Sequence, residues 1–134
     1  MRVGILPLGR ATFDVAYASE MLAAMVARLE QLDISIVGSR EMHLDSETAR
    51  ASLADLTTVE IDCLLVLQVT FTDAAMMVEV ARHFDGRLAI WAPPEPRLGA
   101  RLRLNAFCGL NLASHALGLT DRPFSWLYAA PERV

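Results

Sequence analysis

This chain of 134 residues contains no lysine, and it has twelve arginines. Without lysine the chain has no side chain for a Schiff base and none to complete a P-loop. Its formal net charge is -4, whereas a surface that binds nucleic acid is normally basic. The composition therefore excludes two large classes of site and argues against a nucleic-acid partner.

Cysteines are few and long apolar runs are absent. Cys63 and Cys108 are too few for a disulfide framework or a structural zinc site, and both lie in apolar runs. We therefore expect buried free thiols in a reducing cytoplasm. No apolar run approaches the roughly 18 to 20 residues that cross a bilayer, and the start lacks a signal-peptide pattern. The sequence predicts a cytoplasmic protein that makes no membrane contact.

Hydrophobic residues are abundant, at 54% of the chain, with a mean hydropathy of +0.34. A fully buried parallel sheet explains part of this excess, and surface covered by other subunits or a further domain explains the rest. Residues 1–134 are long enough for one independent core. We expect a single α/β domain that self-associates and belongs to a longer protein.

Apolar runs and helical patterns alternate along the chain. Strands are predicted at 2–8, 33–38, 63–69, 87–91 and 125–129, and helices at 14–32, 46–60, 74–84 and 104–117. Asp14 is placed to cap the first helix, and Gly109 to interrupt the last. The alternation predicts a three-layer, flavodoxin/Rossmann-like parallel sheet of four to five strands with helices on both faces.

The carboxyl ends of the strands are the expected ligand edge of such a sheet. Three polar loops follow these ends, at 9–10, 69–73 and 91–97. Trp91 is either a cap on the core or a platform on which a sugar ring stacks. His115 is either a core histidine or, with Asn105 and Asn111, part of a polar stripe. The edge therefore carries either a site or an interface.

Familiar catalytic sites are not encoded here. No strand is followed by G-x-G-x-x-G, and the acidic pair of a receiver domain is missing. The histidines at 43, 83 and 115 show no metal-ligand spacing. Cys108 and His115 are seven residues apart, or about 10 Å along a helix, which is too far for a nucleophile pair. We expect no catalytic residue and no metal site within this chain.

Three segments together resemble the amino-terminal domain of the L-fucose isomerase and L-arabinose isomerase superfamily, in its L-fucose isomerase-related branch. They are residues 4–14 (G-I-L-P-L-G-R-A-T-F-D), 67–76 (L-Q-V-T-F-T-D-A-A-M) and 91–118. The second resembles the T-F-S-P-A-K-M-W loop of arabinose isomerases, and 110–118 resembles their N-L-N-Q-S-A-H-G, which places the family's histidine on His115. After the fourth strand W-A-P-P-E-P-R replaces the family's T-Q-F, so Trp91 is carried over from the tryptophan of fucose isomerases instead.

The resemblance implies a function. Members are three-domain aldose–ketose isomerases that work through an ene-diol, with Mn²⁺ or a similar divalent ion held in the later domains. The first domain carries no cofactor; it packs onto a neighbouring subunit's active site and closes over the sugar, which it binds weakly alone. The residues that would contact the sugar or brace its rim are Arg10, Phe71, Trp91, Glu95, Arg97, Arg101, Asn105 and His115.

A second hypothesis belongs to another class. The chain would then be a free-standing flavodoxin-like module that binds a small sugar, an anion or a protein partner without catalysis.

Overall fold

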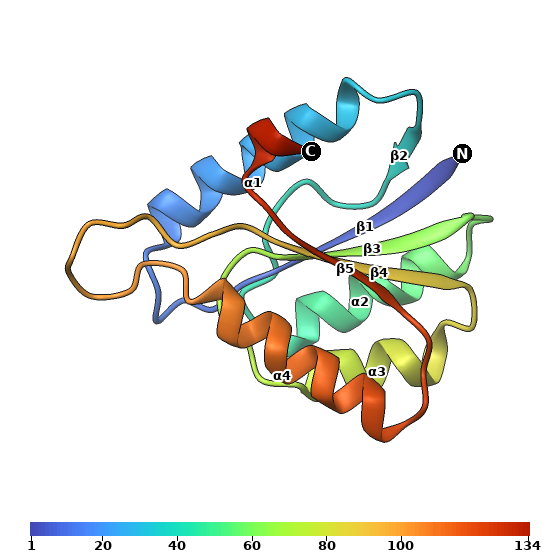
Figure 1. Cartoon of the computed structure of the whole chain (residues 1–134). Coiled ribbons are helices and arrows are strands. Elements are labelled where there is room, and N and C mark those ends of the chain that lie inside the picture. The colour runs from blue at the N-terminus through green and yellow to red at the C-terminus, as the bar shows by residue number, and fades with distance from the viewer.

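The protein folds around one parallel sheet of five strands in the order β2-β1-β3-β4-β5 (Figure 1). The structure is a computed structural model that describes residues 1–134. This strand order is that of flavodoxin-like doubly wound domains. The α/β class expected from the sequence is confirmed. The elements are β1 (Arg2–Leu8), α1 (Val15–Glu30), β2 (Ser35–Val37), α2 (Ser46–Thr57), β3 (Cys63–Gln68), α3 (Ala75–His83), β4 (Arg87–Ala92), α4 (Ala106–Leu119), β5 (Ser125–Tyr128) and the 3₁₀ turn η1 (Pro131–Arg133).

The helices are divided unequally between the two faces of the sheet. α2, α3 and α4 lie side by side on one face, whereas α1 and the short η1 lie on the other (Figure 1). Leu64 and Val66 of β3 and Ile90 of β4 are fully or almost fully buried under the three-helix layer. The layers are therefore those of a doubly wound fold, with one face more completely covered than the other.

The first helix shows how local sequence places an element. Asp14 is its N-cap, and its carboxylate accepts a hydrogen bond from the Tyr17 backbone N–H at 3.0 Å. This bond satisfies one of the free donors of the first turn, as the sequence predicted. Buried side chains then recur at helical spacing and join the core: Ala18, Leu22, Met25, Val26 and Leu29.

The last helix differs from its prediction. α4 runs without interruption through Gly109 and ends at Leu119, two residues beyond the predicted end at 117. A Cβ built on Gly109 would lie 3.0 Å from Gln68 Nε2, so this glycine lets α4 approach the sheet closely. The expected break at Gly109 was wrong because the glycine serves packing and not a bend.

One expectation for the cysteines also needs correction. Cys63 is half-buried, but Cys108 is exposed on α4, because the apolar pattern of that helix extends over both of its sides. Both thiols are free. None of the helices is long and apolar enough to span a bilayer.

Candidate functional site

Three loops that follow β1, β3 and β4 are joined by hydrogen bonds at one edge of the sheet. The Arg10 N–H donates to Thr70 Oγ1 at 2.9 Å, and the Phe71 N–H donates to the Leu104 carbonyl at 2.8 Å. The Asp14 N–H donates to the Arg103 carbonyl at 3.1 Å. The expected meeting of these loops at one rim is confirmed, and we call this edge the carboxyl rim.

Arg10 is held in place by two neighbours at the carboxyl rim. Its Nη2 donates to Asp73 Oδ2 at 2.6 Å, and its guanidinium carbon lies 5.4 Å from the ring centroid of Phe71. Phe71 is itself supported by Phe13, with ring centroids 6.1 Å apart. The Arg10 side chain remains 38% exposed. A planar donor group is thus held from two sides and still faces solvent.

A cavity of about 250 Å³ adjoins Arg10 at the point where the strand order reverses between β1 and β3. Ligands of open α/β sheets bind at such switch points. The walls come from the β1 loop, the β3 loop and the first turn of α2, and include Gly9, Arg10, His43, Asp45, Ser46, Thr72 and Asp73. Burial lowers the pKa of His43, against the opposing effect of Asp45 and Glu41. The cavity is small, polar on one side and open to solvent.

Glu95 organises the loop after β4. Its carboxylate accepts hydrogen bonds from the backbone N–H groups of Arg103, Leu104 and Asn105 at 2.5, 3.0 and 2.7 Å. Asn105 occupies the N-cap position of α4 without a side-chain capping bond and takes the left-handed conformation with φ of 51°, which asparagine tolerates better than most residues. Glu95 thus shapes the rim by closing a loop, and its oxygens are already engaged.

A second ion pair ties this loop to the first. Arg103 Nε donates to Asp14 Oδ2 at 2.8 Å, and the guanidinium lies 3.9 Å from the ring centroid of Tyr17. The Tyr17 N–H and then Arg103 lower the pKa of Asp14. Arg101 lines a neighbouring depression with Asp14, and Arg97 is exposed on the extended loop. The loop after β4 is therefore anchored at both ends, and the side chains of Arg97 and Arg101 extend from it without an ion-pair partner.

Trp91 does not belong to the open surface. Only 1% of it is exposed, and its indole N–H donates to the Ala129 carbonyl at 2.9 Å. The expectation that its ring offers a platform to a sugar is corrected, because the segment after β5 covers it. Trp91 is the core cap that the sequence left as an alternative.

His115 is exposed, so it is not a core histidine. It lies nine residues beyond the start of α4, or about 13 Å along the helix from the carboxyl rim. Asn111 is exposed on the same helix. The cavity beside Arg10 includes neither Trp91 nor His115 among its lining residues. The structure brings together Arg10 and Phe71, places Glu95 and Asn105 in one adjoining loop, and leaves His115 apart.

Sequence reasoning named Asp73 and Thr70 only as parts of a turn, and it assigned no site role to His43 or Ser46. Asp73 lies in the short loop between β3 and α3, so its position at the rim was a usable signal for a partner of Arg10. The wall formed by His43 and Ser46 had no such signal, since it depends on a parallel bridge between Leu8 and His43. No group of three or more His, Cys, Asp or Glu side chains is arranged to hold a metal ion.

The topology defines an open, doubly wound α/β domain, and Arg10 lies at the edge of its sheet where domains of this class bind ligands. The particular family follows from comparison with known proteins. Residues 4–133 match the description "Fucose/sulfoquinovose isomerase, N-terminal domain", and the chain belongs to this family.

Curated relatives agree with that assignment. The chain is 28% identical over 127 residues to the sulfoquinovose isomerase of Priestia megaterium, which covers 95% of this chain and 28% of that protein. It is 30% identical over 133 residues to the sulfoquinovose isomerase of Clostridium sp. (strain MSTE9), which covers 98% of this chain and 29% of that protein. The chain thus spans less than a third of the length of these relatives. No solved structure matches it significantly.

Proposed function

We propose that this chain is the substrate-covering and oligomerising N-terminal domain of an aldose–ketose isomerase. In this proposal the carboxyl rim contributes sugar contacts to an active site that a neighbouring subunit completes. Family membership supports the reaction class, and the relatives' names support a sulfonated aldose as the substrate class. A divalent ion of the Mn²⁺ type would be held by parts of the longer protein outside this domain and would polarise the sugar oxygens.

The observation that carries the proposal is the presentation of Arg10. Asp73 and Phe71 hold its guanidinium at the switch point of the sheet, and part of the side chain stays open. A guanidinium offers parallel N–H donors that match two oxygens of a sulfonate or two sugar hydroxyls. Because the group is already oriented, little side-chain freedom is lost when a sugar binds.

Apolar side chains left on the surface support the assembly. Phe107, Leu112 and Leu119 are exposed on α4, and Leu98 and Leu102 are exposed on the loop beside the rim. Covering these side chains with another protein surface would remove apolar area from water, which favours association. We place the neighbouring subunit against the loop side, where it would share the sugar with Arg10.

In this proposal the residues of the domain bind the sugar, orient it and shield it from water. Arg10 donates hydrogen bonds to the end of the sugar remote from the reacting carbons. The loop held by Glu95 covers the sugar and excludes water while the hydrogen moves between neighbouring carbons. Binding at the remote end improves orientation, so its loss lowers turnover as well as affinity.

The test is Arg10→Ala in the full-length enzyme, with sulfoquinovose as the substrate. We expect kcat/KM to fall about a hundredfold, because the variant loses charge-assisted hydrogen bonds worth roughly 3 kcal/mol. Metal content and sedimentation should stay unchanged. Arg82→Ala removes an exposed arginine at the end of α3, away from the rim, and is the matched control. Equal activity of the two variants contradicts the proposal and favours a non-catalytic binding module.

A further inference from the structure

One half of the sheet is covered on a single face only. Ile5, Leu65, Ala89 and Ser125 are paired in register across β1, β3, β4 and β5, so they form one row on the α1 side. Ile5 is fully buried under α1, Leu65 and Ala89 are half-buried, and Ser125 is exposed. Burial therefore decreases along the row with distance from α1, which leaves this part of β3, β4 and β5 without a helix over it.

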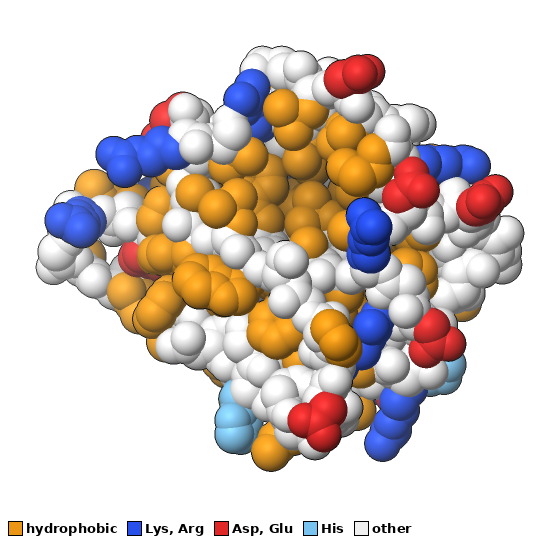
Figure 2. All heavy atoms as spheres, turned by 45° about the vertical axis from the view of Figure 1, so that its right-hand side comes forward, with side chains coloured by type: hydrophobic (Ala, Val, Ile, Leu, Met, Phe, Trp, Pro, Cys, Tyr) orange, Lys and Arg blue, Asp and Glu red, His pale blue; other side chains and the backbone are white.

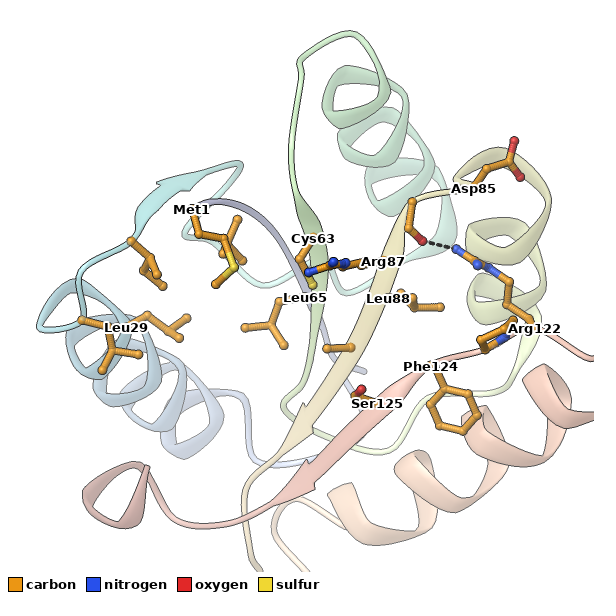
Figure 3. Close-up of a pocket in the computed structure, with 16 residues that line it drawn as sticks. Met1, Leu29, Cys63, Leu65, Asp85, Arg87, Leu88, Arg122, Phe124 and Ser125 are labelled. Carbon is orange, nitrogen blue, oxygen red and sulfur yellow. Dashed lines mark hydrogen bonds between the residues drawn. The ribbon is translucent and has the colours of Figure 1, made fainter.

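This open half forms a hollow with a volume of about 640 Å³. Cys63 and Leu65 contribute to its floor, Leu29 of α1 stands on one side, and Phe124 stands on the other (Figure 3). Ala89 also lines it, next to Leu65 in the same row. Figure 2 shows a hollowed apolar surface with basic and acidic side chains at its border. We call this surface the sheet hollow.

The segment after β5 closes the sheet hollow at one end. Ala129 accepts the Trp91 indole N–H, and the chain then crosses to α1, where the Arg28 guanidinium binds the Val134 carbonyl oxygen. Figure 1 shows this crossing from β5 to η1 beside α1. The row that contains Trp91 is thereby covered, while the rows of Leu65 and Cys63 stay open. A polypeptide that continues from Val134 starts beside the sheet hollow.

The dimensions of the open half match one helix. Neighbouring strands are about 4.8 Å apart, so the distance from β3 to β5 is about 10 Å. A helix with its side chains is about 10 to 12 Å wide. Parallel sheets are normally covered by helices on both faces. One helix laid alongside α1 would complete the layer.

The border of the sheet hollow indicates the chemistry of that helix. Arg122 Nη2 donates to the carbonyl oxygens of Phe84 and Gly86, whereas its Nε is buried without a partner. Arg87 lies exposed at the same border. An occupant with an apolar stripe and an acceptor, either a carboxylate or the carbonyls of a helix C-terminus, would pair with Arg87.

We infer that the sheet hollow is the seat of one amphipathic helix from the polypeptide that follows the N-terminal domain in the longer isomerase chain. Curated relatives carry more than two thirds of their length outside the matched part, so such a segment is available to them. The inference rests on the proposed function, because it assumes that the domain is one part of an isomerase chain. The inference goes beyond the proposed function because it names the face of the sheet that binds the rest of the isomerase chain.

The two cysteines provide the test. Cys63 lies in the sheet hollow and Cys108 lies on the exposed side of α4. Trypsin cleaves after arginine but not at Arg122–Pro123, so it separates the two thiols into peptides 51–82 and 104–133, and mass spectrometry reports each thiol by itself. Alkylation with N-ethylmaleimide is timed in the 134-residue chain and in the full-length protein. We expect the rate at Cys63 to fall at least about tenfold in the longer protein, whereas both thiols should react in the urea-unfolded protein, which shows that the reagent is active.

An equal Cys63 rate in both proteins overturns the inference, as does a natural reading frame that stops after Val134. Protection of Cys63 that appears in the 134-residue chain only at high concentration indicates a second copy as the occupant and also overturns it. If the full-length protein is an active isomerase and Cys63 stays reactive, the docking of the helix is wrong but the proposed function stands. If Cys63 is protected and the protein has no isomerase activity, the proposed function is wrong but the docking stands.

A second test uses a pair of variants in the full-length protein, so it does not require the 134-residue chain to fold by itself. Ala89→Trp fills the floor of the sheet hollow, and Ala24→Trp makes the same change at an exposed position on α1. In the full-length protein we expect Ala89→Trp to lower Tm by at least about 5 °C relative to Ala24→Trp, because overfilling displaces the helix. Equal Tm values for the two variants would contradict the inference that a helix occupies the sheet hollow.

Discussion

Gly109 of α4 lies directly against the side chain of Gln68 in β3, and an added Cβ would come within 3.0 to 3.1 Å of three Gln68 atoms. Gln68 has no room to withdraw, because it is fully buried and its Nε2 donates to the Thr70 carbonyl and to Thr72 Oγ1. The contact sets the distance between α4 and the sheet next to the loop that carries Phe71. Packing of the helix and shape of the rim therefore depend on one missing methyl group.

Replacing Gly109 by alanine should therefore destabilise the protein although alanine is the better helix former. The overpacking cost exceeds the gain in helix propensity, which gives a net loss of about 1 kcal/mol. The matched variant Gly118→Ala lies in the same helix with nothing within 4 Å of the new Cβ, and it should gain about 0.5 kcal/mol. Urea unfolding of both variants measures the difference. Stabilisation by both would mean that Gln68 moves freely.

Glu95 should matter for the loop and for the start of α4. Glu95→Ala leaves three backbone N–H groups without their acceptor, so we expect a loss of about 2 to 3 kcal/mol in the free energy of unfolding. Glu95→Gln keeps one acceptor oxygen and should lose less. Native-state trypsin cleavage after Arg97 and Arg101 should also become faster in the alanine variant. Unchanged cleavage would show that the prolines alone hold the loop.

His43 should make stability depend on pH. Burial lowers its pKa below the ordinary value of 6.5, so the folded state favours the neutral ring. Between the unfolded and folded pKa values the unfolded chain binds more protons, and stability falls as the pH drops below about 6.5. His43→Gln should flatten this slope in urea midpoints measured from pH 7.5 to 5. His115→Gln changes an exposed histidine and is the control; an equally flattened slope there would contradict the assignment to His43.

The layers of the fold were predictable from sequence, because side-chain period and apolar content act locally. β3 and its neighbours read as buried strands, and Asp14 could be recognised as a cap from its position ahead of the periodic residues of α1. The convergence of three loops at one rim also followed, since parallel strands end at the same edge of a sheet. Arg10 and Phe71 were placed there by the same argument and by the family resemblance.

The roles of individual side chains at that rim required the tertiary structure. Whether Trp91 faces a ligand or the core depends on the segment after β5, which returns 38 residues later to accept its N–H. Gly109 looked like a helix break because its neighbour Gln68 is distant in sequence, and Asp73 became the partner of Arg10 only when β1 and β3 paired. Sequence by itself determined the elements and the edge at which they end, through periodicity and apolar content. Only the tertiary structure decided which polar groups are already engaged, which remain open, and which face of the sheet lacks a cover, because these depend on contacts between residues far apart in the chain.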